Sequence, residues 1–345
     1  AMFVIGQSMQ ESGYLLYLFN RIFGRARNAD QLVLLILFAM GFLSALLMND
    51  TLAIIGTPLM LYFSRELKIS AKMLLLTLAF AVTIGSAMSP IGNPQNLLIA
   101  INSGLSNPFL VFLQHLMLPT VANLILAYLL LRLFYSGQFE KKQLQIQSGQ
   151  IIDPTLARLS RLSFILLFAL ILAKMGAVLL GIGQDFPLTY IALISALPVL
   201  LFSSRRAEVV RGIDWCTLIF FAAMFVLMDA VWRSGFFQSL LAGPHSDLAT
   251  VPAILAFSVV MSQLVSNVPL VALFQPMLVH PSTEALMALA AGSTIAGNLF
   301  ILGAASNVII IQNAEKSGET ITFLEFAKVG APLTVLNILV YWIFL

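Results

Sequence analysis

The sequence predicts an all-α polytopic membrane protein with two inverted-topology repeats, each containing a re-entrant helical hairpin and a broken transmembrane helix. Three observations lead to this prediction: the composition, the placement of Lys and Arg between apolar segments, and an internal repeat. Of the 345 residues, 60% are hydrophobic and only 10% are charged, whereas soluble domains have about 45–50% apolar and about 25% charged residues. So few charged residues cannot cover the surface of a soluble protein of this size. The chain is therefore expected to cross a membrane repeatedly.

The composition also excludes several classes of protein. Cys216 is the only cysteine, which rules out a disulfide framework and a cysteine-cluster metal site. The net charge is only +3, and Lys and Arg sit in short connections rather than along one stripe, so nucleic acid is not an expected partner. The expected surroundings are membrane lipid.

Twelve apolar segments organise the chain, and several approach the ~20 residues that a spanning helix needs. They are 1–20, 32–47, 52–63, 73–101, 109–135, 162–182, 188–204, 214–232, 251–265, 269–279, 286–311 and 323–345. Polar residues interrupt 73–101 and 286–311. We assign 1–135 to the first repeat, 136–161 to a cytoplasmic linker and 162–345 to the second repeat.

The first hairpin is predicted to enter from the cytoplasm. Its arms, 32–47 and 52–63, are shorter than a full span and are joined by the polar tip Met48-Asn49-Asp50-Thr51. Basic residues precede the first arm and follow the second: Arg21, Arg25 and Arg27 come before 32–47, and Arg65, Lys68 and Lys72 come after 52–63. Basic flanks lie in the cytoplasm, and a polar turn at membrane depth must be buried in protein or line a water-filled cavity.

The second hairpin is predicted to enter from the opposite side. Its arms, 251–265 and 269–279, meet at Ser266 and Asn267, and the flanking loops 242–250 and 280–285 contain no Lys or Arg. Such loops are expected outside the cell. The remaining connections agree with this topology, which describes a multi-pass protein of the inner (cytoplasmic) membrane.

The two halves also align with each other. Ala1-Met2-Phe3-Val4 matches Ala223-Met224-Phe225-Val226, and further pairs follow in the same order: Asn49/Asn267, Pro58/Pro276, Thr83/Thr294, Gly92/Gly303, Asn96/Asn307 and Asn123/Asn337. Segments 162–182 and 188–204 lack a partner in the first half. Either roughly 60 residues precede Ala1 in the full protein, or the first repeat is naturally short.

The two hairpin tips and the polar interruptions of 73–101 and 286–311 are expected to converge near the membrane midplane. Transporters built from inverted repeats bind their substrates there. Pro and Gly free backbone groups; carbonyl, Asn and Ser oxygens suit a cation such as sodium, whereas helix N-termini suit an anion. The candidate binding residues are Asn49, Asp50, Thr51, Gly92, Asn93, Gln95, Asn96, Ser266, Asn267, Gly303, Ser306 and Asn307. The candidate sodium ligands are Asn49, Asp50, Asn96, Asn267 and Asn307. The alternative is that these side chains only satisfy the broken backbone.

Two acidic residues are candidate proton sites. An ionised Asp50 at membrane depth costs about 2.5–3.5 kcal/mol on insertion scales, so it should face a cavity or a partner; it could bind sodium, carry a proton or cap the following helix. Asp229 lies within an apolar span and is either a second ion site or a buried structural partner.

These motifs resemble the ion transporter superfamily that contains the arsenite-efflux and sodium/proton antiporter (ArsB/NhaD) families, the pigmentation P-protein group and the divalent-anion:sodium symporters. The resemblance rests on Met48–Thr51, Pro90–Asn96, Ser266–Pro269, Gly303–Val308 and the tail through Gly330. It implies a homodimer with a scaffold domain and a transport domain that moves like an elevator, coupled to sodium or protons.

The hairpin tips depart from the symporter pattern. The dicarboxylate symporters have Ser-Asn-Thr at both tips, whereas Met48 stands at the first Ser position and Asp50 and Val268 at the Thr positions. A carboxylate substrate would be repelled by Asp50 unless a cation intervened. The sequence therefore favours an efflux antiporter for arsenite or a related small oxy-species, with sodium-coupled uptake of a dicarboxylate or other anion as the alternative.

An intramembrane enzyme is the alternative from another class. Asp50 and Asp229 could form an aspartyl dyad, but the sequence contains no Gly-x-Gly-Asp element, no His-Glu-x-x-His motif and no Gly-x-Ser-x-Gly elbow. We therefore expect no catalysis and no cofactor other than the coupling sodium ion or proton.

Overall fold

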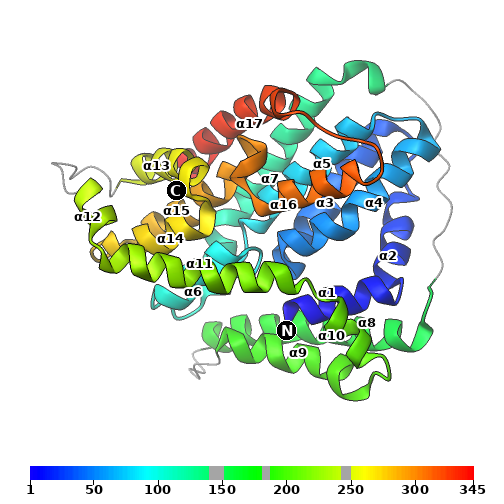
Figure 1. Ribbon diagram of the computed structural model, residues 1–345, viewed down its shortest axis with the longest axis horizontal. Helices are drawn as coiled ribbons and strands as arrows, with labels where there is room; N and C mark the ends of the chain where they lie inside the picture. The colour runs from blue at the N-terminus through cyan, green and yellow to red at the C-terminus, as the bar shows by residue number, and fades with distance from the viewer. Residues whose placement is uncertain (140–150, 181–186, 242–249) are drawn as a thin grey trace.

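The computed structural model describes residues 1–139, 151–180, 187–241 and 250–345, which form helices and no strands. The expected all-α class is confirmed (Figure 1). The predicted linker 136–161 and the predicted outer loops 183–187 and 242–250 lie partly outside the described residues.

The helices follow the order of the predicted apolar segments. Those before the linker are α1 (Met2–Glu11), α2 (Tyr14–Phe23), α3 (Ala29–Leu47), α4 (Asn49–Leu67), α5 (Ala71–Ser86), α6 (Pro94–Asn102) and α7 (Pro108–Phe134). Those after it are α8 (Pro154–Leu179), α9 (Leu188–Phe202), α10 (Arg206–Gly212), α11 (Trp215–Arg233), α12 (Phe236–Leu241), α13 (Val251–Val265), α14 (Asn267–Phe274), α15 (Thr283–Ile295), α16 (Ala305–Glu315) and α17 (Phe323–Phe344).

Within the described residues, four helices are long and apolar enough to cross a membrane: Ala29–Leu47, Pro108–Phe134, Pro154–Ala177 and Phe323–Phe344. Shorter apolar helices cover Ala71–Ser86, Leu188–Phe202 and Val251–Val265. Length and composition thus support a polytopic membrane protein. The first hairpin arm, α3, is itself among the four, so the re-entrant course of the hairpins remains a prediction.

Both predicted hairpin turns are single residues in the left-handed region. Met48 (φ 69°) joins α3 to α4, and Ser266 (φ 71°) joins α13 to α14. The arms of the first hairpin are longer than 32–47 and 52–63, because the polar residues at both ends join the helices: Asn28 caps α3 by accepting from Gln31 N, and Asn49 begins α4.

The second arm of the second hairpin is shorter than predicted. Helix α14 ends at Phe274, and a 3₁₀ turn, Gln275–Met277, follows at Pro276. The repeat mate Pro58 stays inside the continuous helix α4. Equivalent prolines therefore do not have equivalent effects in the two halves.

The predicted breaks lie between α5 and α6 and between α15 and α16, and each is braced by the amide of a repeat-equivalent asparagine. Asn96 Nδ2 donates to the carbonyls of Ser86, Ala87 and Ser89 at 3.1–3.2 Å. Asn307 Nδ2 donates to the Gly297 carbonyl at 2.6 Å. The freed carbonyls are thus satisfied, as buried polar groups must be.

The two helices that precede the breaks form the centre of the molecule. Every residue of α5 except Lys72 is buried, and the helix packs against α3 and α4, as Figure 1 shows. A Cβ atom on Gly85 would clash with the backbone of Gly41, so glycine permits the close approach of α5 and α3. Helix α15 has the same place in the second half and packs against α13.

A second group of helices lies along one edge of the molecule: α8, α9 and α10, with α1 against them (Figure 1). Helices α1 and α2 are joined at Gly13 (φ 72°), and α11 and α12 at Gly235 (φ 71°). These glycines are a pair in the sequence repeat, so the halves share this kink. The inverted orientation of the two repeats remains a prediction.

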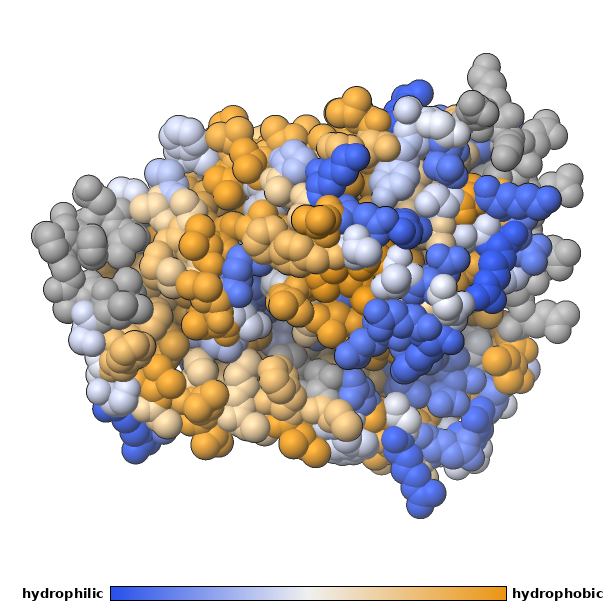
Figure 2. Space-filling view, turned by 45° about the horizontal axis from the view of Figure 1, so that its top comes forward, coloured by the Kyte–Doolittle hydropathy of each residue, from blue (hydrophilic) through white to orange (hydrophobic). Residues whose placement is uncertain are grey.

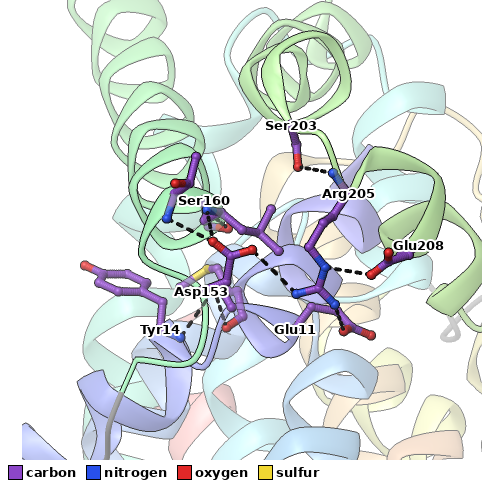
Figure 3. A network of polar contacts seen from close by, with 11 residues as sticks. Glu11, Tyr14, Asp153, Ser160, Ser203, Arg205 and Glu208 are labelled. Atoms are coloured by element: carbon purple, nitrogen blue, oxygen red, sulfur yellow. Dashed lines mark hydrogen bonds and ion pairs between the residues drawn. The ribbon is translucent and has the colours of Figure 1, made fainter.

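Arg205 ties this group of helices together (Figure 3). Its guanidinium contacts Glu11 of α1 at 3.4 Å, Asp153 before α8 at 3.6 Å and Glu208 of α10 at 2.6 Å. Asp153 also caps α8 by accepting from Leu156 N and Thr155 N. Glu11 is therefore held by a partner from a distant segment of the chain.

The exposed surface is divided by polarity. Figure 2 shows apolar residues over most of the visible face and hydrophilic residues gathered toward one end. Two polar contacts join helix ends: Lys72 Nζ of α5 pairs with Glu325 Oε1 of α17, and Arg65 of α4 donates to the carbonyl of Ser317, which follows α16. Arg65 and Lys72 are among the residues predicted to face the cytoplasm.

Candidate functional site

The predicted tips and breaks meet around one small cavity of about 40 Å³, which we call the tip cavity. It is bordered by the start of α4, α6, α14 and α16, so both hairpins and both broken helices contribute. The lining residues are Asn49, Asp50, Pro94, Gln95, Phe220, Met224, Ser266, Asn267, Val268, Ala304 and Ala305. Because a water molecule occupies about 30 Å³ in the liquid, the cavity has the size of an ion or a water.

The first hairpin tip is bonded to the breaks of both halves. Asn49 N donates to the Gly92 carbonyl at 3.0 Å, and Asn49 Nδ2 lies 3.5 Å from Ser306 Oγ. Asn49 Oδ1 accepts from Asp50 N at 3.0 Å. These contacts fix the tip backbone and place the Asp50 side chain at the cavity.

Asp50 is buried, with 3% of its surface exposed. Across the described parts of the chain, no Lys, Arg or His forms an ion pair with its carboxylate. A buried charge without a partner is costly, so this carboxylate requires either a proton or a bound cation.

Within the described residues, unpartnered oxygens occur on three of the candidate residues, of which Asn267 lines the tip cavity. Thr51 Oγ1, Asn267 Oδ1 and Asn307 Oδ1 are buried without a hydrogen-bond partner. Hydroxyl and amide oxygens are ligands of hard cations, so this donor set fits a sodium ion. Asn96 differs, because its amide is fully used by the break and its Oδ1 accepts from Thr294 at 3.4 Å.

The other predicted residues brace the breaks. Asn93 caps α6 by accepting from Asn96 N and donates to Ser86 Oγ and Thr294 Oγ1. Gln95 Nε2 lies 3.5 Å from the same Thr294 oxygen. A Cβ on Gly92 would clash with the Ser86 carbonyl, and one on Gly303 would lie 2.6 Å from the Ala296 carbonyl, so both positions require glycine.

Asp229 is not brought to the tip cavity. Its side chain is 58% exposed and pairs with Arg233 at 2.8 Å, one helical turn further along α11. Helix α11 instead contributes Phe220 and Met224 to the cavity wall. Sequence reasoning missed these two, because apolar residues in an apolar span carry no signal that distinguishes a cavity wall from a lipid-facing surface.

A second, larger cavity of about 290 Å³ adjoins the first hairpin tip at Thr51, and we call it the α1 chamber. Its walls come from α1, α4, α16 and the connection from α10 to α11. The lining residues are Phe3, Gln7, Gln10, Thr51, Ile54, Gly212, Ile213, Asp214, Ile309, Gln312, Asn313 and Lys316. The sequence contained a signal for it, namely the amides at 7, 10, 312 and 313 within apolar helices.

The described residues contain no cluster of cysteine, histidine or carboxylate side chains of the kind that binds a metal ion. No group of three or more His, Cys, Asp or Glu side chains there could hold a metal ion. The candidate chemistry is therefore reversible binding at the tips and in the chamber.

Comparison with known proteins agrees with a transport role. The family model for citrate transporters, CitMHS, matches residues 1–285. The chain is 30% identical over 370 residues to the uncharacterized transporter Rv2684 of Mycobacterium tuberculosis, with 100% of this chain and 83% of the relative covered. It is 28% identical to a 46 kDa membrane protein of Mycobacterium leprae, with 100% and 84% covered.

A plant relative is also similar over nearly the whole chain. The silicon efflux transporter LSI3 of Oryza sativa subsp. japonica is 25% identical, with 97% of this chain and 82% of the relative covered. The family and these relatives are named as transporters rather than enzymes, which agrees with the expectation from the missing catalytic motifs. The chain belongs to the CitMHS citrate transporter family, within the ion transporter superfamily, and is a membrane transporter.

Proposed function

We propose that the protein is a secondary active transporter of the inner membrane that exports a small oxy-species in exchange for a proton or a sodium ion. Asp50 carries the coupling ion: the observation behind this assignment is a buried carboxylate without an ion-pair partner, at a cavity where all four tips meet. An ion that binds there neutralises Asp50, so occupancy of the tip cavity changes the electrostatic cost of moving the tip.

The lining residues favour an uncharged, hydroxylated substrate. Among the described residues, no Lys or Arg lines the tip cavity, and the α1 chamber is lined by one acidic and one basic residue, Asp214 and Lys316. Anion sites use Arg or Lys to balance charge. Arsenous and silicic acids, which are uncharged at neutral pH, fit this lining, and the name of the rice relative refers to silicon efflux.

Sodium-coupled uptake of a carboxylate is the second candidate. The family is described as one of citrate transporters, which favours this candidate. The N-termini of α4, α6, α14 and α16 also lie at the tip cavity. Helix N-termini attract anions. On this alternative, sodium bound beside Asp50 would screen its charge from the carboxylate.

Transport by the purified protein in liposomes separates the two candidates. A pH gradient and a sodium gradient are imposed separately, with arsenite, silicic acid, phosphate, succinate and citrate as solutes. We expect flux of arsenous or silicic acid against its gradient when the proton or sodium gradient opposes it. Sodium-driven accumulation of succinate or citrate, without flux of the uncharged acids, would replace the proposal with the symporter.

A further inference from the structure

We propose that the α1 chamber, and not the tip cavity, is the binding site for the transported solute, and that the solute is a small uncharged polyhydroxylated molecule. This inference rests on the proposed function and adds the place and chemistry of the solute site. The two cavities are lined by successive residues of the first hairpin tip: Asp50 lines the tip cavity, and Thr51 lines the chamber.

Size separates the two cavities. The tip cavity, at about 40 Å³, accommodates an ion or a water, whereas sites for organic ligands start at roughly 300 Å³. The chamber, at about 290 Å³, reaches that range. Of the two cavities that adjoin the first hairpin tip, only the chamber therefore has room for a solute with several hydroxyl groups in this conformation.

The polar lining of the chamber matches hydroxyl groups. Gln7, Gln10, Gln312 and Asn313 each carry an amide, which offers both donors and an acceptor. A hydroxyl group also donates and accepts, so such groups pair with amides without a change of charge. With one acidic and one basic residue in the lining, the chamber has no net charge with which to select an anion.

Two of the four amides, those of Gln7 and Asn313, have side-chain hydrogen bonds to neighbouring residues. Gln7 Nε2 donates to Glu11 Oε1 at 3.1 Å, and Glu11 is fixed by Arg205 within the network of Figure 3. Gly212 approaches so closely that a Cβ there would clash with Gln7 Nε2. On the opposite wall, Lys316 Nζ donates to Asn313 Oδ1 at 3.3 Å. A wall with a fixed geometry suits recognition rather than passive filling.

The chamber also touches the coupling element directly. Thr51 lies in its wall with an unpartnered, buried hydroxyl, and Gly6 of α1 packs so tightly that a Cβ there would clash with Thr51 Cγ2. A solute bonded to Thr51 is therefore one residue away from Asp50. This arrangement lets the solute and the coupling ion influence the same tip through neighbouring residues.

A cavity on the other half supplies a matched control. It has a volume of about 370 Å³ and contains Asn102, the repeat mate of Asn313, and Ala272, the mate of Ile54. It contains no tip residue, and Gln275 Nε2 bridges to the Ile99 carbonyl at 3.3 Å. Substitution at Asn102 thus tests the equivalent place in the repeat without affecting the α1 chamber.

The kinetic test uses proteoliposomes loaded with silicic acid or arsenous acid. Because one lost hydrogen bond weakens binding by about 3- to 10-fold, Gln312→Ala and Gln10→Ala are expected to raise KM for the solute by that factor. The maximal rate and the dependence on the coupling ion should not change. Asn102→Ala should leave KM unchanged. An unchanged KM in both chamber variants overturns the site.

A binding test does not depend on transport. In a Cys216→Ala background, Asn313→Cys and Asn102→Cys are labelled with a maleimide in purified protein, with silicic acid, sulfate or no addition. Silicic acid is expected to slow labelling at 313 several-fold and not at 102, and sulfate should slow neither. Protection at 313 by sulfate alone, or no protection by silicic acid, contradicts the inference. Protection without any gradient-driven flux would instead refute the proposed coupling and leave the chamber site standing.

Discussion

At the scale of single residues, the hairpin tips and the start of α16 contain buried groups that lack partners within the described residues. Asp50 is buried without an ion pair, and the side-chain oxygens of Thr51, Asn267 and Asn307 are buried without a hydrogen bond. A buried polar group of this kind costs roughly 1–3 kcal/mol. The cost is understandable if the groups are completed by a transported ion.

Asp50→Asn removes the charge while preserving the shape of the side chain. We expect the variant to lose solute movement driven by an ion gradient, because an amide neither releases a proton nor balances a cation. Folding should be retained, since no ion pair is broken. Flux in proteoliposomes and thermal unfolding of the purified protein measure the two effects.

The control for this variant is Asp229→Asn. Asp229 is exposed and paired with Arg233 on the outside of α11, so its loss should leave gradient-driven flux near the wild-type rate. Full gradient-driven flux in Asp50→Asn would remove Asp50 from the coupling site.

Asn267→Ala tests the cation ligands. The Asn267 Oδ1 atom has no protein partner, so its removal should act mainly on the ion and raise the half-saturating sodium concentration by about 10-fold. Asn123→Ala, in α7 and away from the tip cavity, serves as the comparison. An unchanged cation dependence in Asn267→Ala would show that this oxygen is not a ligand; a proton-coupled protein would show no sodium dependence in either form.

At the scale of elements, the breaks were predictable and the cavities were not. Ser89–Asn96 and Gly303–Asn307 contain the Pro, Gly and Asn residues that end helices, so the sequence located both breaks and both hairpin turns. The α1 chamber brings Gln10, Asp214 and Gln312 together from three distant elements. That proximity comes from tertiary packing, which no local pattern encodes.

The course of α11 illustrates the same limit. Asp229 attracted attention as a rare acidic residue in an apolar span, yet packing turns it outward, and Phe220 and Met224 line the tip cavity instead. The arms of the first hairpin were placed correctly but too short, since hydropathy ignores the polar capping residues that extend a helix.

Gly85→Ala tests the contact at the centre of the fold. A Cβ at Gly85 would clash with the backbone of Gly41, and overpacking of a tight core contact typically costs about 1–3 kcal/mol. We expect a lower midpoint of thermal unfolding. Gly176→Ala in α8, where a Cβ meets nothing within 4 Å, should be neutral or slightly stabilising. Equal behaviour of the two variants would contradict the close packing of α5 on α3.

At the scale of the whole molecule, the Arg205 network joins α1, α8 and α10. The pKa of Asp153 is lowered, chiefly by the hydrogen bond from Leu156 N and further by that from Thr155 N and by Arg205. Because its pKa is lowered in the folded state, ionised Asp153 stabilises the fold at pH values above its unfolded-state pKa of about 3.9. This stabilisation is lost as the pH falls through the folded-state pKa.

This linkage predicts acid sensitivity of the α1 wall. The network is partly exposed to solvent, so its loss should destabilise the docking of α1 only modestly. Limited proteolysis of the α1–α2 region should accelerate below about pH 4. Arg205→Gln, which removes the partner of three carboxylates, should show faster cleavage at neutral pH. An identical cleavage rate for Arg205→Gln and wild type would exclude a role for the network.

The membrane orientation of the two halves is a separate prediction at this scale. Glu66 lies at the end of α4 and Glu284 at the start of α15, and both are exposed. In a Cys216→Ala background, cysteines at these positions should react with an impermeant maleimide from opposite sides of the membrane. Reaction of both from one side would contradict the inverted topology.

The most direct test of the account measures two fluxes at once. Proteoliposomes containing the wild-type protein are given a gradient of arsenous or silicic acid alone, and the movement of protons and of sodium is recorded together with the solute. The account predicts an opposite flux of one of these ions in fixed proportion to the solute, and loss of that ion flux in Asp50→Asn. Solute movement with no accompanying ion flux, or with an ion flux that Asp50→Asn preserves, would contradict it.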